Sequence, residues 1–148
     1  MNVNATRPIE ILLVEDSPSD TALTIEALKA GKIANRLFNV DDGVEAMAYL
    51  RKQGVYKNAP VPDLIMLDLN LPKKDGREVL AELKNDPHLK LIPVIVLTTS
   101  QADEDILKAY ELQANCYITK PVDFKNFIEV IKAIEHFWLA VVTLPPRI

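Results

Sequence analysis

The chain has 148 residues, which leaves room for one globular domain of ordinary size and not for a second folded module. Its 21 acidic and 17 basic residues give a formal net charge of −4, which argues against general binding to nucleic acids or anionic membranes. The single cysteine, Cys116, excludes an internal disulfide framework, and the lack of a signal-like start or of an apolar run of roughly 20 residues predicts a soluble cytoplasmic protein.

Apolar runs and helix-start signals alternate along the first part of the chain. Ile9–Val14 is short and almost entirely apolar, which is typical of a strand covered on both faces. Ser17 as N-cap and Pro18 at the first helical position then predict a helix that continues to Gly31. The next elements expected are a strand over Arg36–Val40 and a helix that begins at Asp42 and ends before Gly54.

The same alternation continues in the second part of the chain. The segment Val55–Pro62 contains two prolines and has no periodicity, so it is expected to be a loop. Leu64–Leu67 is apolar throughout and predicts a third strand with Asp68 at its end. The remaining elements expected are strands over Pro93–Leu97 and Cys116–Thr119 and helices over Gly76–Asn85, Asp103–Gln113 and Asp123–Trp138.

This order of elements predicts the fold class and the domain organisation. Five apolar strands alternating with five helices are typical of a doubly wound α/β domain, in which helices cover both faces of a parallel sheet. We expect this domain over residues 9–138, with an N-terminal segment, 1–8, before it and an apolar tail, 139–148, after it. No output domain is expected in the ten residues after Trp138.

Polar residues stand where the predicted strands end. Ligands of open parallel sheets bind beyond the carboxyl ends of the strands, so we expect these residues to meet at one edge of the sheet. They are Glu15 and Asp16 after the first strand, Asp68 at the end of the third, Thr98 after the fourth and Lys120 after the fifth.

These residue types together favour phosphoryl chemistry on a carboxylate. Two carboxylates about 4 Å apart repel each other by roughly 4 kcal/mol at an effective dielectric constant near 20, so three together need compensation by a cation or by raised pKa values. Oxygen ligands select Mg²⁺ or a similar ion. Lys120 can neutralise a phosphoryl group, Thr98 can hydrogen-bond its oxygens, and an aspartate can act as the nucleophile.

Each of these residues also has a simpler interpretation by itself. An aspartate after a strand is commonly a helix cap or a solvated loop residue, and a lysine before a proline commonly lies on the surface. The occurrence of all five residues at strand ends favours a shared site over five independent explanations.

Four motifs carry a family resemblance. V-E-D-S, L-D-L-N-L-P-K-K-D-G, V-L-T-T-S and Y-I-T-K-P, in this order, strongly resemble the receiver domain of bacterial two-component response regulators. The resemblance covers about Ile9 to Trp138. It implies a flavodoxin-like, five-stranded parallel sheet with strand order 2-1-3-4-5 and five surrounding helices.

The resemblance also implies a role for each site residue. Asp68 would accept a phosphoryl group from the phosphohistidine of a sensor histidine kinase. Asp16 and Asp68 would bind Mg²⁺, or Mn²⁺, through their side chains, Asn70 would add its backbone carbonyl, and Glu15 would support the metal shell. Lys120 would pair with the phosphoryl oxygens. The protein would then be a signalling switch and not an enzyme, beyond assisting its own phosphorylation and dephosphorylation.

Thr98 and Tyr117 match the switch pair of the family. The resemblance implies that the hydroxyl turns toward the phosphoryl group and that the aromatic ring swings inward behind it. From the residues alone, Tyr117 is equally well a half-buried packing residue beside a strand. The family often has Gly-Ala shortly before this tyrosine, whereas Gln113-Ala114 stands here, and this departure puts the geometry of that loop in doubt.

The proline-containing loop before the third strand and the ending F-W-L-A-V-V-T-L-P-P resemble the stand-alone regulators that pair with cyanobacterial and bacterial phytochrome kinases. This narrower resemblance implies a phytochrome as partner kinase and a homodimer. The apolar residues at the end of the last helix are the expected interface, with folding of the tail back onto its own domain as the alternative. The interface candidates are Phe137, Trp138, Leu139 and Val141.

Two other classes of function remain as alternatives. A Mg²⁺-dependent phosphatase or phosphotransferase of the haloacid dehalogenase type would need a second aspartate two residues after the nucleophile, whereas Asn70 stands there. A nucleotide or flavin binder would need a glycine-rich loop, and the four glycines of the chain are not clustered. Both alternatives therefore fit the sequence less well than a receiver domain.

Overall fold

A five-stranded parallel sheet forms the centre of the molecule in the computed structural model, which describes residues 8–30, 34–98, 116–120 and 125. The strand order is β2-β1-β3-β4-β5, with every neighbouring pair parallel, so the predicted fold class and strand order are confirmed. The strands are β1 (Ile9–Val14), β2 (Asn35–Val40), β3 (Leu64–Asp68), β4 (Val94–Thr98) and β5 (Cys116–Thr119).

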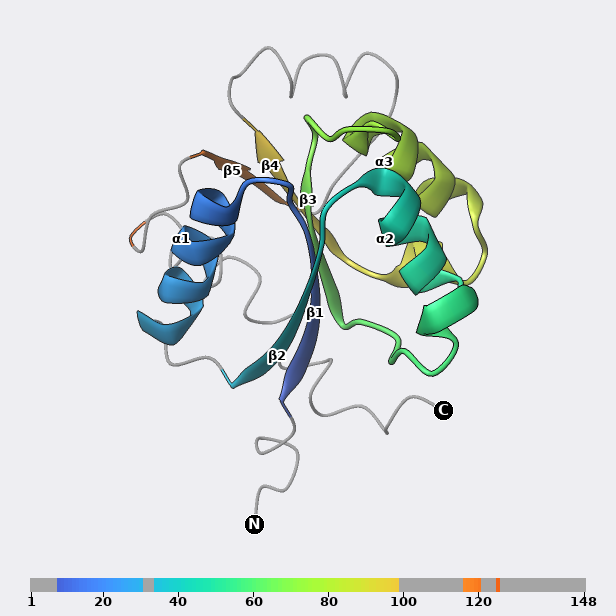
Figure 1. Ribbon diagram of the computed structural model, residues 1–148, viewed down its shortest axis with the longest axis horizontal. Helices are drawn as coiled ribbons and strands as arrows, with labels where there is room; N and C mark the ends of the chain where they lie inside the picture. The colour runs from blue at the N-terminus through green and yellow to red at the C-terminus, as the bar shows by residue number, and fades with distance from the viewer. Residues whose placement is uncertain (1–7, 31–33, 99–115, 121–124, 126–148) are drawn as a thin grey trace.

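Helices lie on both faces of this sheet (Figure 1). One face carries α1 (Pro18–Ala30), and the other carries α2 (Gly43–Leu50) and α3 (Gly76–Asn85). Two single-turn 3₁₀ helices, η2 (Gly54–Tyr56) and η3 (Leu89–Leu91), complete the described elements. The expected helices at 103–113 and 123–138 lie outside the described residues. None of the described helices is long and apolar enough to span a bilayer.

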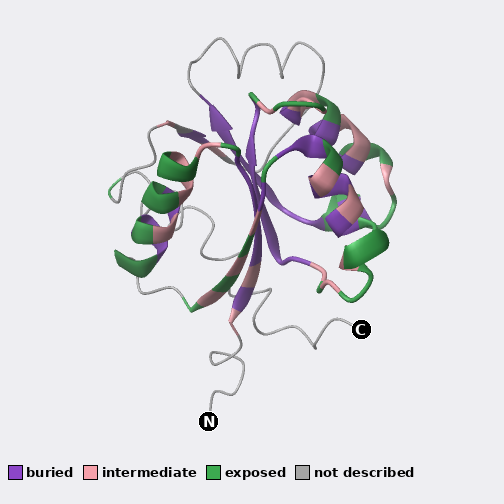
Figure 2. Ribbon diagram, viewed as in Figure 1, coloured by how far each residue is buried: buried purple, intermediate pink, exposed green. Residues whose placement is uncertain are grey.

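The two faces of the sheet bury separate hydrophobic cores. In β1, Ile11 and Leu13 pack toward α1, whereas Leu12 and Val14 pack toward α2 and α3, because successive side chains of a strand point to opposite faces. Figure 2 shows β1, β3 and β4 buried along most of their length. Burial on both faces explains why these strands are almost entirely apolar in the sequence.

The edge strand β2 has a different character. Its residues alternate between half-buried and exposed until the buried Val40, and Phe38 remains 43% exposed. This edge position explains the weak sequence signal for β2, whose expected start at Arg36 differs from the observed start at Asn35 by one residue. The expected loop before β3 also differs from the structure, since it begins with the 3₁₀ turn η2.

Side-chain caps hold the helix starts just beyond the carboxyl ends of the strands. Asp42 caps α2 by accepting a hydrogen bond from the Glu45 amide at 2.8 Å. A capping box formed by Asp75 and Glu78 begins α3. Position 76 requires glycine, because the Cβ atom of any other residue would lie 2.3 Å from the Asp68 carbonyl oxygen and clash with it. The α3 start is thereby packed directly against the backbone of Asp68.

Candidate functional site

Three carboxylates meet at the carboxyl edge of the sheet. Glu15 and Asp16 follow β1, and Asp68 is the last residue of the adjacent β3. One oxygen from each lies within 4.8 Å of one from each of the others. Glu15 and Asp68 are buried, whereas Asp16 is exposed, so the cluster opens to solvent on the side of Asp16. The structure therefore brings together the acidic residues that the strand-end rule selected.

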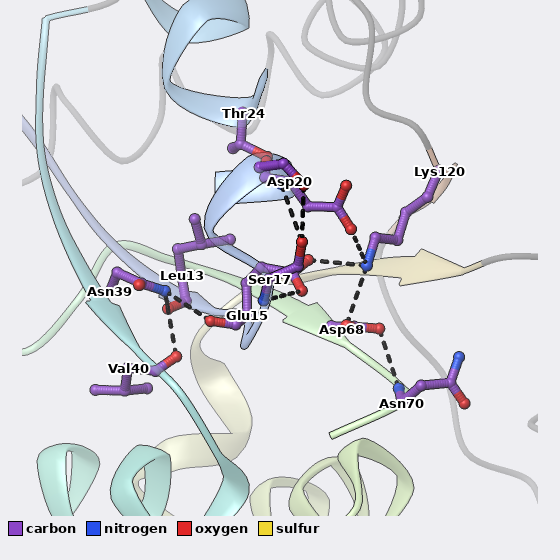
Figure 3. Close-up of polar contacts among 11 residues, drawn as sticks. Leu13, Glu15, Ser17, Asp20, Thr24, Asn39, Val40, Asp68, Asn70 and Lys120 are labelled. Carbon is purple, nitrogen blue, oxygen red and sulfur yellow. Dashed lines mark hydrogen bonds and ion pairs between the residues drawn. The ribbon is translucent and has the colours of Figure 1, made fainter. Parts of the chain in front are cut away.

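Lys120, directly after β5, places its ammonium group in this cluster. Its Nζ atom lies 3.1 Å from Asp68 Oδ2, 3.0 Å from Glu15 Oε1 and 2.8 Å from Asp20 Oδ2 (Figure 3). Only 12% of the Lys120 side chain is exposed, so these ion pairs are largely shielded from water. The lysine cancels part of the negative charge that the carboxylates bring to the edge.

The pKa values of two groups follow from this arrangement. Burial raises the pKa of Glu15 to about 7; its bond with Lys120 opposes that rise, and the nearby Asp68 charge adds to it. Burial alone lowers the pKa of Lys120, but bonds to Asp20, Glu15 and Asp68 outweigh it and hold that pKa above its usual value. Lys120 therefore remains a cation at neutral pH, in a site that still has an excess of carboxylates.

The donor set of this site suits a hard divalent cation. Carboxylate oxygens are ligands that Mg²⁺ and Mn²⁺ accept, and Mg²⁺ usually takes one or two carboxylates and keeps several waters. Glu15, Asp16 and Asp68 provide such oxygens from two adjacent strands. Because Asp16 faces solvent, the cluster satisfies both the ligand type and the access to water that such an ion requires.

The other predicted site residues lie on β4 and β5 or directly after β3. The Asn70 amide donates to Asp68 Oδ1 at 3.0 Å and so fixes the orientation of that carboxylate. Thr98, fully buried at the end of β4, accepts a 2.6 Å hydrogen bond from the Lys120 amide through its backbone carbonyl. Its side-chain Oγ1 is buried and has no hydrogen-bond partner among the described residues. Tyr117 is half-buried and packs against the core on the α2–α3 face.

Two residues near the site were not among the sequence candidates. Asp20 lies in the first turn of α1, where an acidic residue is commonly explained by helix capping, yet its side chain pairs with Lys120. Asn39, on the edge strand β2, donates through Nδ2 to the carbonyls of Leu13 and Glu15 at 3.0 and 3.2 Å. No periodicity or spacing identifies Asn39. The interface candidates Phe137, Trp138, Leu139 and Val141 lie outside the described residues.

Comparison with known proteins agrees with this geometry. The family model "Response regulator receiver domain" matches residues 11–132. The response regulator Rcp1 of Synechocystis sp. is 53% identical over 145 residues, which cover 98% of this chain and 99% of Rcp1.

Solved structures give the same picture. The Mn²⁺-bound form of Rcp1 is 55% identical, with a TM-score of 0.75 over 94% of this chain and 100% of that one. The phosphorylated cyanobacterial phytochrome response regulator RcpA is 54% identical, with a TM-score of 0.77 over 95% of this chain and 100% of that one. Receiver domains bind Mg²⁺ or Mn²⁺, which agrees with the oxygen donors described above. On the family match and these relatives, the chain belongs to the response regulator receiver domain family, whose members signal through phosphorylation.

Proposed function

We propose that this regulator accepts its phosphoryl group on Asp68, from the phosphohistidine of a sensor histidine kinase. The observation that carries the proposal is the 3.1 Å ion pair between Lys120 Nζ and Asp68 Oδ2 inside a cluster of three carboxylates. A cation and a candidate metal site therefore both adjoin one buried nucleophile. The dehalogenase-type alternative is not favoured, since the relatives are response regulators.

In the transfer, an oxygen of Asp68 forms a bond to phosphorus while the bond from phosphorus to the kinase histidine breaks. Lys120 pairs with the phosphoryl oxygens, and the buried Thr98 hydroxyl is available to hydrogen-bond one of them. Asp16 and Asp68 would hold Mg²⁺ or Mn²⁺ through side chains, Asn70 through its carbonyl, with Glu15 in support. The ion, when bound, neutralises charge on the phosphoryl oxygens.

The response to phosphorylation would run through Thr98 and Tyr117. A phosphoryl group adds a charge of about −1.5 to −2 and three acceptor oxygens, which reward a hydroxyl that turns toward it. Turning of the Thr98 side chain would leave space at the end of β4. The ring of Tyr117, a residue of the neighbouring β5 that packs against the core, would move into this space.

We further propose a phytochrome as the partner kinase and a homodimer as the assembly. The phytochrome assignment is supported by RcpA, a phytochrome response regulator with 54% identity. The dimer would use Phe137, Trp138, Leu139 and Val141, in the apolar end of the chain. We place the protein in the cytoplasm, acting by contact with proteins, not with nucleic acid or membranes, and without turnover of an external substrate.

Phosphorylation by a small donor tests the assignment of Asp68. With acetyl phosphate and Mg²⁺, the intact mass of the wild-type chain should increase by one phosphoryl group. When EDTA replaces Mg²⁺, only a small fraction of the chains should carry this group. The Asp68→Asn variant should gain none.

The matched control is Asp41→Asn, which removes an exposed carboxylate that follows β2 at the same edge of the sheet. It should be phosphorylated like the wild type. An adduct that persists in Asp68→Asn, or a wild-type chain that never forms one, would refute the proposed function.

A further inference from the structure

Lys120 has three carboxylate partners in the unphosphorylated protein, and an ammonium group has three N–H donors. The partners are Asp20, Glu15 and Asp68, at 2.8, 3.0 and 3.1 Å from Nζ (Figure 3). Three carboxylates therefore already surround the ammonium group, which donates a hydrogen bond to Asp68 and is ion-paired with Glu15 and Asp20. An arriving phosphoryl oxygen can come equally close to Lys120 Nζ only if one of the three carboxylates moves away.

Asp20 is the partner that can leave most easily. The side chains of Glu15 and Asp68 are 1% and 3% exposed, so either carboxylate would lose its counter-ion without gaining water. The side chain of Asp20 is 28% exposed, so its carboxylate can be rehydrated when it releases Lys120. Asp68, in addition, is itself the residue that becomes phosphorylated under the proposed function.

The Asp20 side chain is not required for the start of α1. The Ser17 hydroxyl accepts a hydrogen bond from the Asp20 amide at 3.3 Å, as an N-cap does. In a capping box, the acidic residue at this third helical position would return a bond to the N-cap amide. Here the Ser17 amide donates to Glu15 Oε2 at 3.2 Å instead.

The start of α3, at the same edge, provides an internal comparison. In α3 the equivalent acidic residue, Glu78, does accept from the amide of its N-cap, Asp75, at 3.4 Å. The Asp20 backbone is meanwhile held by the Ser17 bond and by the Thr24 hydroxyl, which donates to the Asp20 carbonyl at 3.1 Å. Asp20 can thus release Lys120 by a side-chain movement alone.

We propose that Asp20 is a positioning residue that occupies one donor of Lys120 in the unphosphorylated protein and is displaced from it by the phosphoryl group. This inference rests on the proposed function. Asp20 slows phosphorylation in two ways, because its bond to Lys120 must be broken and because its charge repels an anionic donor. The residue lies outside the sequence motifs of the family resemblance and is not among the expected metal ligands.

The test compares phosphorylation rates of intact chains with acetyl phosphate at several concentrations and saturating Mg²⁺, followed by intact mass. Asp20→Asn should be phosphorylated roughly two- to fivefold faster than the wild type, the range expected for release of one partly exposed ion pair. Asp20→Glu keeps the charge and should return the rate toward the wild-type value. Asp41→Asn removes an equal charge from the same edge and should leave the rate unchanged.

The outcomes separate this inference from the proposed function. If Asp20→Asn is slower than the wild type, or no faster than Asp41→Asn, then Asp20 does not compete for Lys120 and the inference is wrong while the proposed function stands. If the wild type forms no adduct, both are wrong. Thermal unfolding midpoints of all variants show whether a rate change comes from lost structure, and equal midpoints with the expected rates support the role of Asp20.

Discussion

At the scale of single residues, the site is defined by an excess of negative charge. Glu15, Asp20 and Asp68 surround the ammonium group of Lys120, and Asp16 lies beside Glu15 and Asp68 in the carboxylate cluster. The raised pKa of Glu15, about 7, reflects its burial first and the nearby Asp68 charge as well. Such a site gains stability from a bound divalent cation, which is the physical reason that metal and phosphoryl binding belong together here.

Asp16 offers the cleanest test of the metal site, because it is the exposed member of the carboxylate cluster. Asp16→Asn should weaken Mn²⁺ binding by at least about tenfold, the lower end of the loss expected when a group that supports a bound metal is removed. The loss can be measured from free Mn²⁺ by electron paramagnetic resonance. Asp41→Asn should bind Mn²⁺ as the wild type does, and equal affinity of all three proteins would contradict the assignment of Asp16.

Sequence reasoning predicted correctly which charged residues meet at one edge of the sheet. Glu15, Asp16, Asp68 and Lys120 each follow an apolar run, and topology then brings them to one edge. Asp20 was missed because its partner lies a hundred residues away in the chain. An acidic residue in the first turn of a helix is already explained by the helix dipole, so nothing in its local sequence points to Lys120.

At the scale of elements, ion pairs connect the loop after β3 with both helices of its face. Glu82 on α3 bonds with Lys74 in that loop and lies 3.2 Å from Arg51, at the end of α2. The hydrogen bond from Lys74 is the main cause of a lowered pKa of Glu82, with partial burial opposing it. The group is thus more stable as a carboxylate in the folded chain than in the unfolded one.

Glu82→Gln should therefore destabilise the fold at pH 7 by about 0.5–1 kcal/mol, a typical value for a partly shielded pair. Because the folded pKa lies below the ordinary value of 4.5, this contribution is present above pH 4.5 and disappears as the pH falls through the folded pKa. Urea unfolding at pH 7 and at pH 3 measures it. Glu26→Gln, at an exposed position of α1, is the control and should change little at either pH. A Glu82→Gln effect that is equal at both pH values would contradict the ion-pair explanation.

The elements that the sequence predicts best are the strands whose burial on both faces leaves a run of consecutive apolar residues. The doubly buried β1, β3 and β4 were predicted within one residue of their observed ends, because burial on both faces makes them almost entirely apolar. The 3₁₀ turns η2 and η3 were not predicted, since a three-residue turn has no hydrophobic period to detect.

At the scale of the whole molecule, the fold delivers its site by topology. The adjacent parallel strands β1 and β3 end at the same edge of the sheet. Strand β5 pairs in parallel with β4, so its carboxyl end, followed by Lys120, lies at that edge too. The strand order was predicted from the family resemblance. The apolar runs alone predict where each strand lies in the sequence but not which strands are neighbours in the sheet. The proposed assembly, by contrast, depends on the apolar run at 137–142, for which the sequence is the evidence.

Light scattering of the intact chain tests that assembly. We expect a homodimer at micromolar concentration, because a run of six apolar residues favours burial against another surface. A chain that ends at His136 should run as a monomer, with circular dichroism as a check that it is folded. An intact chain that is monomeric at every concentration would contradict the proposed dimer.

The central claim is that Asp68 carries the phosphoryl group, and chemical mapping tests it most directly. Borohydride reduces an aspartyl phosphate to homoserine, which tandem mass spectrometry of the phosphorylated and reduced wild-type chain can locate. We predict homoserine at position 68 and at none of the neighbouring carboxylates. Homoserine at position 16 or 20, with none at position 68, would contradict the account of the site given above.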